Sequence, residues 1–360
     1  MSASISRTSI SAEVPPMTTY KAAVAVAPGI LEIQQRPVPT PGEGQVLIRV
    51  EACGVCHSDS ATVEGTAGIP FPRVPGHEVV GRIASLGATV AGWKVGDRVG
   101  VGFLAGEDGS CPSCRRGDFV TCDNPVISGM TIDGGYAEVM VAEARGLVSV
   151  PESLDATEAA PLLCAGLTTF NALRNSGARA GDVVAILGLG GLGHLAVQFA
   201  RKMGFRTVVI ACGGDKDELA KGLGAHDYID SSAEDAATAL KKLGGAQAII
   251  ATAPTGKGMS EIIAGLAPRG TLMVVAVAAD PVSADTVTLV FGGRHIQGTL
   301  TGTVVDNERA LAFAQMQDIK PMVEVFPLER AAEAYKLMMN AEVRFRAVLV
   351  MSPHGNGVRP

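Results

Sequence analysis

An apolar run, a glycine-rich turn and a helical pattern follow one another at residues 183–203, and this succession constrains the fold more than any other feature. The run 183–187 is typical of a buried strand, and apolar residues from Leu192 to Met203 recur at helical spacing. The turn between them is GLGGLG. In such a turn Gly188 permits the sharp bend, Gly190 lets the backbone approach a pyrophosphate, and Gly193 lets the helix pack closely on the strand.

The helix after this turn would present free N–H groups and the positive end of its dipole to phosphates. We therefore predict a dinucleotide-binding site formed by Gly188, Gly190, Gly191, Leu192 and Gly193. The alternative is a glycine-rich turn that binds no ligand.

Apolar patterns elsewhere divide the chain into two domains. Further strand patterns, mostly separated by helical ones, occur at 207–211, 226–229, 247–251, 271–277 and 295–300. They predict a Rossmann-type, doubly wound parallel sheet over residues 166–303, which makes the fold α/β. Residues 19–165 carry short β patterns broken by Gly, Pro and Asp, and we expect the tail 304–360 to return to this mostly β domain. Residues 1–18 are expected to be a disordered extension.

The end of the second strand, TVVIA, bears on which dinucleotide binds. An acid at the strand end would hold the ribose 2′-hydroxyl and select NAD, whereas the strand is expected to end here at Cys212. The missing acid removes repulsion toward a 2′-phosphate, and Lys216 supplies a cation that attracts one. NADP is therefore favoured over NAD. Asp215 is the counter-argument, because its carboxylate can take the ribose role, and Lys216 is alternatively a solvated charge.

Charge and composition argue against several classes of function. A net charge of −6 leaves no basic surface for nucleic acid or for a membrane. No apolar run reaches the roughly 18 residues that a membrane span needs, and the Ser-rich N-terminus lacks the apolar core of a secretory signal. The chain has 7 cysteines, an odd number, which favours free thiols in a reducing cytoplasm over a disulfide framework.

Cysteine and histidine side chains that suit zinc are spread over three motifs. Cys53 and Cys56 lie in CGVCHSD, His77 in PGHEVVG and Cys164 in PLLCAGLTTF. Zinc prefers thiolate and imidazole ligands, and a catalytic site keeps one position open. The motifs are too far apart for spacing alone to unite them. A hydrogen-bonded structural histidine, core cysteines and a Cys53–Cys56 redox pair remain as alternatives.

The segments GVCHSD, PGHEVVG, CAGLTT and GLGGLG occur in an order and separation that resemble the medium-chain, zinc-dependent alcohol dehydrogenase family. The resemblance extends from about Tyr20 to Met351. It implies a GroES-like fold for the mostly β domain, a catalytic zinc ion and a nicotinamide cofactor. Cys56, His77 and Cys164 match the zinc ligands of the family, which leaves Cys53 as a buried core residue.

The resemblance also assigns roles around the metal. Glu78 matches a carboxylate that can approach the zinc from behind, and Asp59 matches the carboxylate that orients the histidine ligand. Ser58 matches the hydroxyl that links the substrate to the proton relay. Neighbours of the cofactor are implied at His57 and Arg346 beside the pyrophosphate and at Thr168 beside the nicotinamide.

A second cysteine group has the spacing C-x2-C-x7-C, at Cys111, Cys114 and Cys122. The structural zinc site of the family has a fourth cysteine three residues before the first of these, and this chain has Asp108 there. Because a carboxylate can bind Zn²⁺ at about 2.0–2.2 Å, we expect a structural zinc held by Asp108 and the three cysteines. The alternative is a metal-free lobe.

Together these motifs predict reversible hydride transfer between an alcohol and NAD(P), with zinc polarising the substrate oxygen. Many family members carry a relay histidine where this chain has Ala61, so the proton would leave through Ser58 and the ribose or through water. Phe103 and Leu104 match an apolar wall, which favours a hydrophobic primary alcohol or aldehyde.

Two other functions remain open from the sequence. A polyol dehydrogenase of the same fold would need polar residues at Phe103 and Leu104. A non-catalytic, NADPH-binding redox sensor would need no zinc, because Cys53 and Cys56 would cycle between thiol and disulfide. The family resemblance implies a homodimer or homotetramer.

Overall fold

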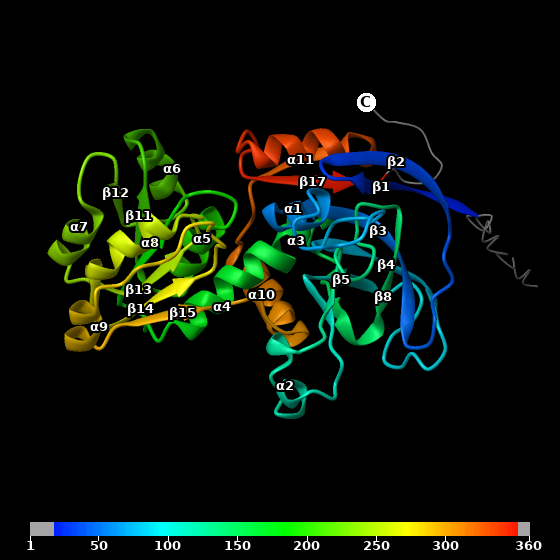
Figure 1. Ribbon diagram of the computed structural model, residues 1–360, viewed down its shortest axis with the longest axis horizontal. Helices are drawn as coiled ribbons and strands as arrows, with labels where there is room; N and C mark the ends of the chain where they lie inside the picture. Colours follow the sequence, from blue (N-terminus) through cyan, green and yellow to red (C-terminus); the bar gives the residue numbers. More distant parts are fainter. Residues whose placement is uncertain (1–17, 352–360) are drawn as a thin grey trace, which may run out of the picture.

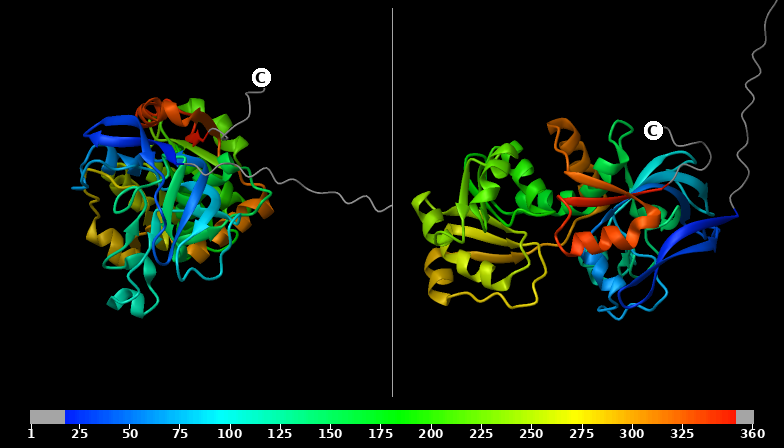
Figure 2. Two further views of the ribbon diagram at one scale, coloured as in Figure 1. Left: turned by 90° about the vertical axis from the view of Figure 1, so that its right-hand side faces the viewer. Right: turned by 90° about the horizontal axis from the view of Figure 1, so that it is seen from above.

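The computed structural model describes residues 18–351, which form two lobes side by side, each around one large sheet (Figures 1 and 2). The extension predicted at 1–18 lies outside the described residues except for Thr18, whose carbonyl accepts a hydrogen bond of 3.1 Å from the Val38 N–H. None of the helices between residues 18 and 351 combines the length and apolar character that a membrane crossing requires.

The six-stranded lobe contains a parallel sheet of order β12-β11-β10-β13-β14-β15. Its strands are β10 (Val183–Leu187), β11 (Arg206–Ala211), β12 (Asp227–Asp230), β13 (Ala246–Ala251), β14 (Leu266–Val274) and β15 (His295–Gly298). The order reverses at β10, as it does in doubly wound folds. The predicted Rossmann-type sheet is confirmed.

Both faces of this sheet are covered, because alternate residues of one strand enter different cores. Val184 and Ile186 of β10 pack in one core, with helix α5 and part of α4, while Ala185 and Leu187 pack in the other, with α7 and α8. The helices of the lobe are α5 (Gly193–Lys202), α6 (Asp217–Gly222), α7 (Ala236–Lys242), α8 (Gly256–Ile262) and α9 (Thr286–Gly292).

The seven-stranded lobe contains a mixed sheet of order β16-β17-β3-β4-β5-β9, with β8 paired to β3. Its strands are β3 (Gln45–Val55), β4 (Val79–Leu86), β5 (Arg98–Val101), β8 (Val139–Glu143), β9 (Leu147–Ser149), β16 (Val323–Pro327) and β17 (Arg346–Val350). Because β17 pairs with β3, the last strand of the chain belongs to this sheet.

Smaller elements complete the seven-stranded lobe. They are the hairpin β1 (Thr19–Ala27) and β2 (Ile30–Pro37), the pair β6 (Leu104–Gly106) and β7 (Val126–Ile127), and the helices α1 (Ser60–Val63), α2 (Pro112–Arg115) and α11 (Ala331–Met339). Helix α2 belongs to a small projection at the lower edge of the molecule in Figure 1.

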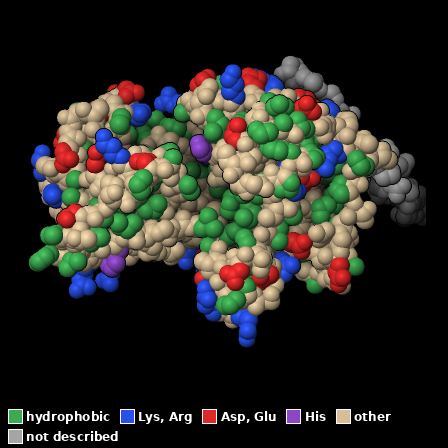
Figure 3. All heavy atoms as spheres, in the orientation of Figure 1, with side chains coloured by type: hydrophobic (Ala, Val, Ile, Leu, Met, Phe, Trp, Pro, Cys, Tyr) green, Lys and Arg blue, Asp and Glu red, His purple; other side chains and the backbone are tan. Residues whose placement is uncertain are grey.

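A helical segment joins the two lobes. It consists of α3 (Ala156–Pro161), a π-helical turn (Leu162–Gly166) and α4 (Leu167–Asn175), and α10 (Val304–Gln317) packs against it. Its apolar side chains belong to one core that also includes Ala52 and Val80 of one sheet and Val184 of the other. This shared core fixes the lobes around the hollow visible between them in Figure 3.

Candidate active site

Four side chains from three distant segments meet near the joining helices. Every pair among the ligand atoms of Cys56, His77, Glu78 and Cys164 lies within 4.8 Å, and all four residues are buried. Cys56 follows β3, His77 and Glu78 precede β4, and Cys164 lies in the π-helical turn. The fold therefore unites the residues that spacing in the sequence could not.

Local structure holds Cys56 and His77 in place. Cys56 caps a short 3-10 helix, His57–Asp59, and its N–H donates to Asp59 Oδ2 at 2.9 Å. Before His77, Gly76 has φ +107, and a Cβ there would come within 2.5 Å of the Tyr136 ring. Only glycine fits this close approach, so PGHEVVG is a structural as well as a chemical motif.

Asp59 orients the imidazole of His77. Its Oδ1 lies 2.9 Å from His77 Nδ1, and its Oδ2 accepts a 2.8 Å hydrogen bond from the buried Tyr136 hydroxyl. A carboxylate at Nδ1 keeps the proton there and leaves the Nε2 lone pair free for a metal. Tyr136 is not recognisable from the sequence, because a tyrosine within a β pattern cannot be distinguished from an ordinary core residue.

Two buried polar atoms of the cluster have neither a hydrogen-bond nor an ion-pair partner among residues 18–351: His77 Nε2 and Glu78 Oε2. Such atoms are costly in an interior unless something satisfies them. A metal ion among two sulfurs, an imidazole nitrogen and a carboxylate does so, and this ligand set suits Zn²⁺. The residues present therefore fit a zinc ion.

Charges near the cluster are paired. The buried guanidinium of Arg346 forms an ion pair with Glu78 Oε1. Burial raises the pKa of Glu78 to about 7, against the lowering effect of Arg346. The shared hydrogen bond between the two thiols lowers the pKa of Cys56 and raises that of Cys164.

The glycine turn lies directly beside Arg346. A Cβ on Gly193 would come within 2.1 Å of the Gly188 carbonyl, and a Cβ on Gly191 would lie 3.0 Å from the Arg346 guanidinium. A Cβ on Gly190 would meet nothing within 4 Å, so this residue faces open space. The arrangement leaves room for a pyrophosphate between the turn and the arginine.

The other predicted neighbours of the cofactor and substrate differ in exposure. His57 and Ser58 are exposed, Thr168 is buried, and Leu192 caps α5. The Phe103 ring packs edge-on against His77, with ring centroids 5.2 Å apart. Leu104 lines a separate cavity of about 370 Å³ with Phe119 and Val304, among others.

The strand before the predicted specificity residues ends with the predicted apolar run 207–211 and begins one residue earlier, at Arg206. β11 ends at Ala211, and Cys212 follows it as an exposed residue. Lys216 Nζ donates to the Cys212 carbonyl at 2.9 Å. Asp230, to which no motif in the sequence points, accepts from the Gly213 N–H at 2.9 Å. The residue directly after the strand is therefore Cys212, and the Asp230 carboxylate lies beside it at Gly213.

The second predicted metal group also comes together. The ligand atoms of Asp108, Cys111, Cys114 and Cys122 all lie within 4.8 Å of one another, around α2. Backbone N–H groups point at two of the sulfurs: those of Cys114 and Asp123 at Cys111 Sγ, and those of Asp108 and Asn124 at Cys122 Sγ, at 3.4–3.5 Å. N–H donors stabilise thiolates, so this geometry fits a zinc ion.

Cys53 lies outside both groups. It is fully buried in β3, where desolvation raises the pKa of its thiol well above the usual range. A raised pKa disfavours the thiolate that disulfide exchange needs.

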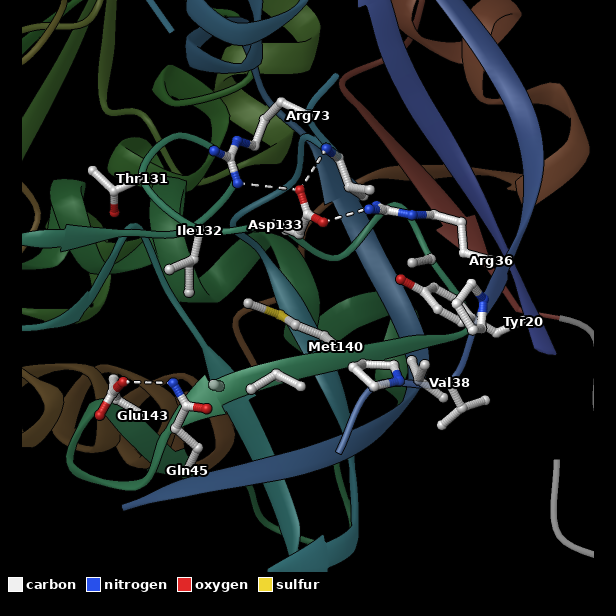
Figure 4. A pocket seen from close by; sticks show the side chains of 18 residues that line it. Tyr20, Arg36, Val38, Gln45, Arg73, Thr131, Ile132, Asp133, Met140 and Glu143 are labelled. Carbon is white, nitrogen blue, oxygen red and sulfur yellow. Dashed lines mark hydrogen bonds and ion pairs between the residues drawn. The ribbon is translucent and has the colours of Figure 1, made fainter. Parts of the chain in front are cut away.

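A larger cavity, of about 560 Å³, lies in the seven-stranded lobe (Figure 4). Asp133 stands at its wall between Arg36 and Arg73, at 2.8 and 3.3 Å, and Tyr20 lines it nearby. None of the residues of the two metal groups lines this cavity. It is therefore separate from the candidate active site.

Residues 42–152 match the family model described as the alcohol dehydrogenase GroES-like domain, and residues 191–316 match the one described as zinc-binding dehydrogenase. The chain is 43% identical to the alcohol dehydrogenase patD of Penicillium expansum, over 93% of this chain and 98% of that protein. The chain belongs to the medium-chain, zinc-dependent alcohol dehydrogenase family.

Other relatives agree with this assignment. An alcohol dehydrogenase of Geobacillus stearothermophilus is 38% identical over 89% of this chain and 95% of its own. Among solved structures, a cinnamyl alcohol dehydrogenase of Sorghum bicolor has a TM-score of 0.84 and 32% identity, covering 92% of this chain and 97% of its own. The GroES-like and Rossmann-type domains are confirmed, and the family implies zinc and a nicotinamide cofactor.

Tyr136→Phe is expected to loosen the zinc site of this dehydrogenase. The change removes only the hydroxyl that fixes Asp59, and loss of such an outer partner typically costs about 10- to 100-fold in metal affinity or activity. Zinc release to a chromophoric chelator, measured beside turnover, checks this. Thr62→Val is the control, because its buried hydroxyl bonds the Gly129 carbonyl instead of Asp59. Equal zinc release from both variants would refute the role of Tyr136.

Proposed function

We propose that this chain oxidises a hydrophobic primary alcohol, or reduces the corresponding aldehyde, by hydride transfer to or from NADP. The observation that carries the proposal is the convergence of Cys56, His77 and Cys164 on one point, joined through Glu78 and Arg346 to the glycine turn. Metal and dinucleotide would thus occupy adjoining places in the hollow between the lobes.

The protein residues supply position and electrostatics. When bound, zinc provides a Lewis acid for the substrate oxygen, and the nicotinamide carries the hydride. Cys56, His77 and Cys164 would hold the metal, with Asp59 fixing the imidazole tautomer. The Glu78 carboxylate lies in the same cluster, and the Arg346 guanidinium balances its charge. The Phe103 ring packed on His77 excludes water from that side of the site.

Ser58 is the proposed proton acceptor. It is exposed and lies two residues after Cys56, so its hydroxyl can pass a proton between the bound substrate and solvent. Ala61 offers no group to continue the relay. We therefore propose that the proton leaves through Ser58, with the ribose or water completing the path.

Phe103 supports an apolar substrate. A polyol would need several hydrogen-bonding partners, and a buried hydroxyl without one is costly. The Phe103 ring against His77 offers none, whereas Leu104 faces the separate cavity and does not bear on the substrate. A polyol dehydrogenase is therefore the less favoured member of the same class.

The NADP preference is supported by the end of β11. The strand ends at Ala211, and Lys216 is the cation four residues beyond Cys212. Asp230 Oδ1 accepts from the Gly213 N–H and from the N–H and hydroxyl of Ser232, so this oxygen is already bonded within the protein. The Lys216 ammonium can donate its hydrogen bond to a 2′-phosphate instead of to the Cys212 carbonyl.

An absorbance assay at about 340 nm tests the function directly, with NADPH and NADH each offered against benzaldehyde, hexanal and acetone. We expect turnover of the aldehydes with NADPH, and a smaller preference for NADPH in Lys216→Ala. Turnover with NADH at equal or higher efficiency would refute the NADP assignment alone. Absence of turnover with every pair in zinc-loaded protein would refute the proposed function.

A redox sensor is the alternative from another class. It requires Cys53 and Cys56 to pair, whereas the structure buries Cys53 in β3 and groups Cys56 with His77 and Cys164. Metal analysis of the purified protein separates the two functions. A content of about two zinc ions per chain supports the dehydrogenase, and none supports the sensor.

Asp108→Asn is expected to weaken the structural zinc site, because a neutral amide replaces a charged ligand. We expect this site to release zinc at least about tenfold faster. Even the loss of a residue that only hydrogen-bonds to a metal ligand costs about tenfold in metal affinity, and Asp108 would be a ligand itself. Asp108→Cys, which restores a four-thiolate set, should release zinc more slowly than the unaltered protein. Chelator-driven release, followed in all three proteins, measures this. Equal rates would exclude Asp108 as a ligand.

We also propose a homodimer formed through β15, an edge of the six-stranded sheet whose four residues are all exposed. Val287, Val290 and Phe291 of the preceding helix α9, which is labelled at the lower left of Figure 1, are 61%, 75% and 88% exposed. An unpaired strand edge next to an apolar patch is a surface that proteins cover.

Light scattering after gel filtration is expected to give the mass of a dimer, and Val290→Glu with Phe291→Lys should yield a monomer. Val325→Lys is the control, because Val325 is an exposed apolar residue on the other lobe, at 49%. A monomeric unaltered protein, or a tetramer that the double variant leaves intact, would refute this interface.

The division of labour between the lobes remains part of the proposal. Residues 19–165 and 304–360 would form the catalytic domain, and residues 166–303 would form the dinucleotide-binding domain. The structure describes the catalytic domain as far as residue 351. The six-stranded sheet is built from residues 183–298 alone, which supports this division.

We also propose a cytoplasmic location, because the chain carries seven free cysteines that suit a reducing environment.

A further inference from the structure

We propose that His194 is a positioning residue that ties the glycine turn to the seven-stranded lobe and so sets the place of Arg346 beside the dinucleotide. This inference rests on the proposed function. His194 lies in the first turn of α5 and is fully buried. None of the roles assigned so far to zinc, dinucleotide or substrate involves this imidazole.

Both ring nitrogens of His194 are used, and they reach different lobes. Nδ1 donates to the Gly190 carbonyl at 3.1 Å, and Nε2 accepts from the Met322 N–H at 3.2 Å. The Met322 donor fixes the neutral tautomer with its proton on Nδ1. Burial lowers the pKa of His194 to about 4, so the ring stays neutral and both bonds persist near neutral pH.

The bond to Met322 continues to the catalytic cluster. The Met322 carbonyl accepts from the N–H groups of Phe345 and Arg346, each at 3.0 Å. The His194 ring also stacks on Phe345, with centroids 4.9 Å apart and the planes 17° from parallel. Arg346 in turn pairs with Glu78 and lies against Gly191. Through Met322 and Phe345, the imidazole therefore connects the glycine turn to Arg346 and sets the distance between them.

One turn further along α5, Gln198 provides a matched comparison. Its Nε2 donates to the Lys320 carbonyl at 2.9 Å and to the backbone carbonyl of His194 at 3.2 Å, and its Oε1 accepts from the Lys320 N–H at 3.3 Å. Gln198 therefore joins the same helix to the same segment of the other lobe without a hydrogen bond to the glycine turn. A purely structural tie between lobes would make the two residues equivalent.

Calorimetric titration of zinc-loaded protein with NADPH and with NADH tests the proposal. In His194→Phe the ring stack and the volume remain but both hydrogen bonds are lost. We expect the dissociation constant of the dinucleotide to rise about tenfold, which corresponds to about 1.4 kcal/mol. Zinc content should stay unchanged. His194→Gln, whose side-chain oxygen can still accept from Met322, should bind more tightly than His194→Phe. Gln198→Leu should bind like the unaltered protein.

Amide hydrogen exchange at residues 188–193 gives a second measurement that does not depend on turnover. It should become faster in His194→Phe and stay unchanged in Gln198→Leu. Equal dinucleotide affinity of His194→Phe and the unaltered protein, or an equal loss in Gln198→Leu, would overturn this inference alone. Failure of the unaltered protein to bind either dinucleotide would instead overturn the proposed function.

Discussion

Cys56→Ala is expected to abolish turnover while the protein still binds its dinucleotide. The change removes one of three zinc ligands contributed by Cys56, His77 and Cys164, and it leaves Cys164 as the only thiolate among the four clustered residues. Loss of a residue that only hydrogen-bonds to a metal ligand already lowers metal affinity or activity by about 10- to 100-fold. Loss of a ligand itself should therefore lower kcat/KM on the order of 10³-fold or more. Zinc content should fall from about two ions per chain to about one.

The matched control is Cys53→Ala. Cys53 lies three residues earlier, is fully buried, and stands outside the cluster. Removal of its sulfur should leave zinc content and turnover near those of the unaltered protein, with a modest loss of stability from the small cavity. Retention of both zinc ions and normal activity in Cys56→Ala would contradict the assigned ligand set. Equal zinc loss in both variants would do the same.

Arg346→Leu is expected to lower the free energy of unfolding of the seven-stranded lobe by about 3–5 kcal/mol, because it leaves the Glu78 carboxylate buried without its partner. The side chains of Arg346 and Glu78 are 4% and 0% exposed. With zinc bound, two thiolates and one carboxylate balance the ion and the arginine, and the substitution removes one positive charge from this set. Urea unfolding followed through Trp93, the single tryptophan, reports on this lobe.

A double variant separates the charge effect from lost packing. Glu78→Gln with Arg346→Leu removes both charges, so it should recover more than half of the stability that Arg346→Leu alone loses. If the double variant is as unstable as the single one, the cost comes from packing around the arginine instead of from the uncompensated carboxylate.

The Rossmann-type half of the fold was predictable because its signals are local. A strand, a glycine turn and a helix follow one another within residues 183–203, and each later strand is an apolar run near its observed place. Boundaries were less exact: the strand pattern at 271–277 begins at Leu266 in the structure, where Pro268 and Gly270 obscure it. β11 begins at Arg206, one residue before the predicted run, and ends with that run at Ala211.

The two metal groups were predictable only in part. Cys111, Cys114 and Cys122 are close in sequence, so spacing alone suggested a site. Cys56, His77 and Cys164 required the family resemblance, since their meeting depends on β3, β4 and the joining helices packing together. Tyr136 and His194 gave no signal, because each resembles a core residue until its hydrogen-bond partners are known.

The π-helical turn that carries Cys164 sets a limit on how this protein can vary. Such a turn holds one residue more than a regular helix would over the same rise. Deletion of a single residue between Pro161 and Leu167 would let α3 and α4 merge into one continuous helix. Everything on one side would then rotate by about 100° relative to the other, which would swing the sulfur away from Cys56 and His77. In this stretch the number of residues is therefore constrained more strictly than their identity.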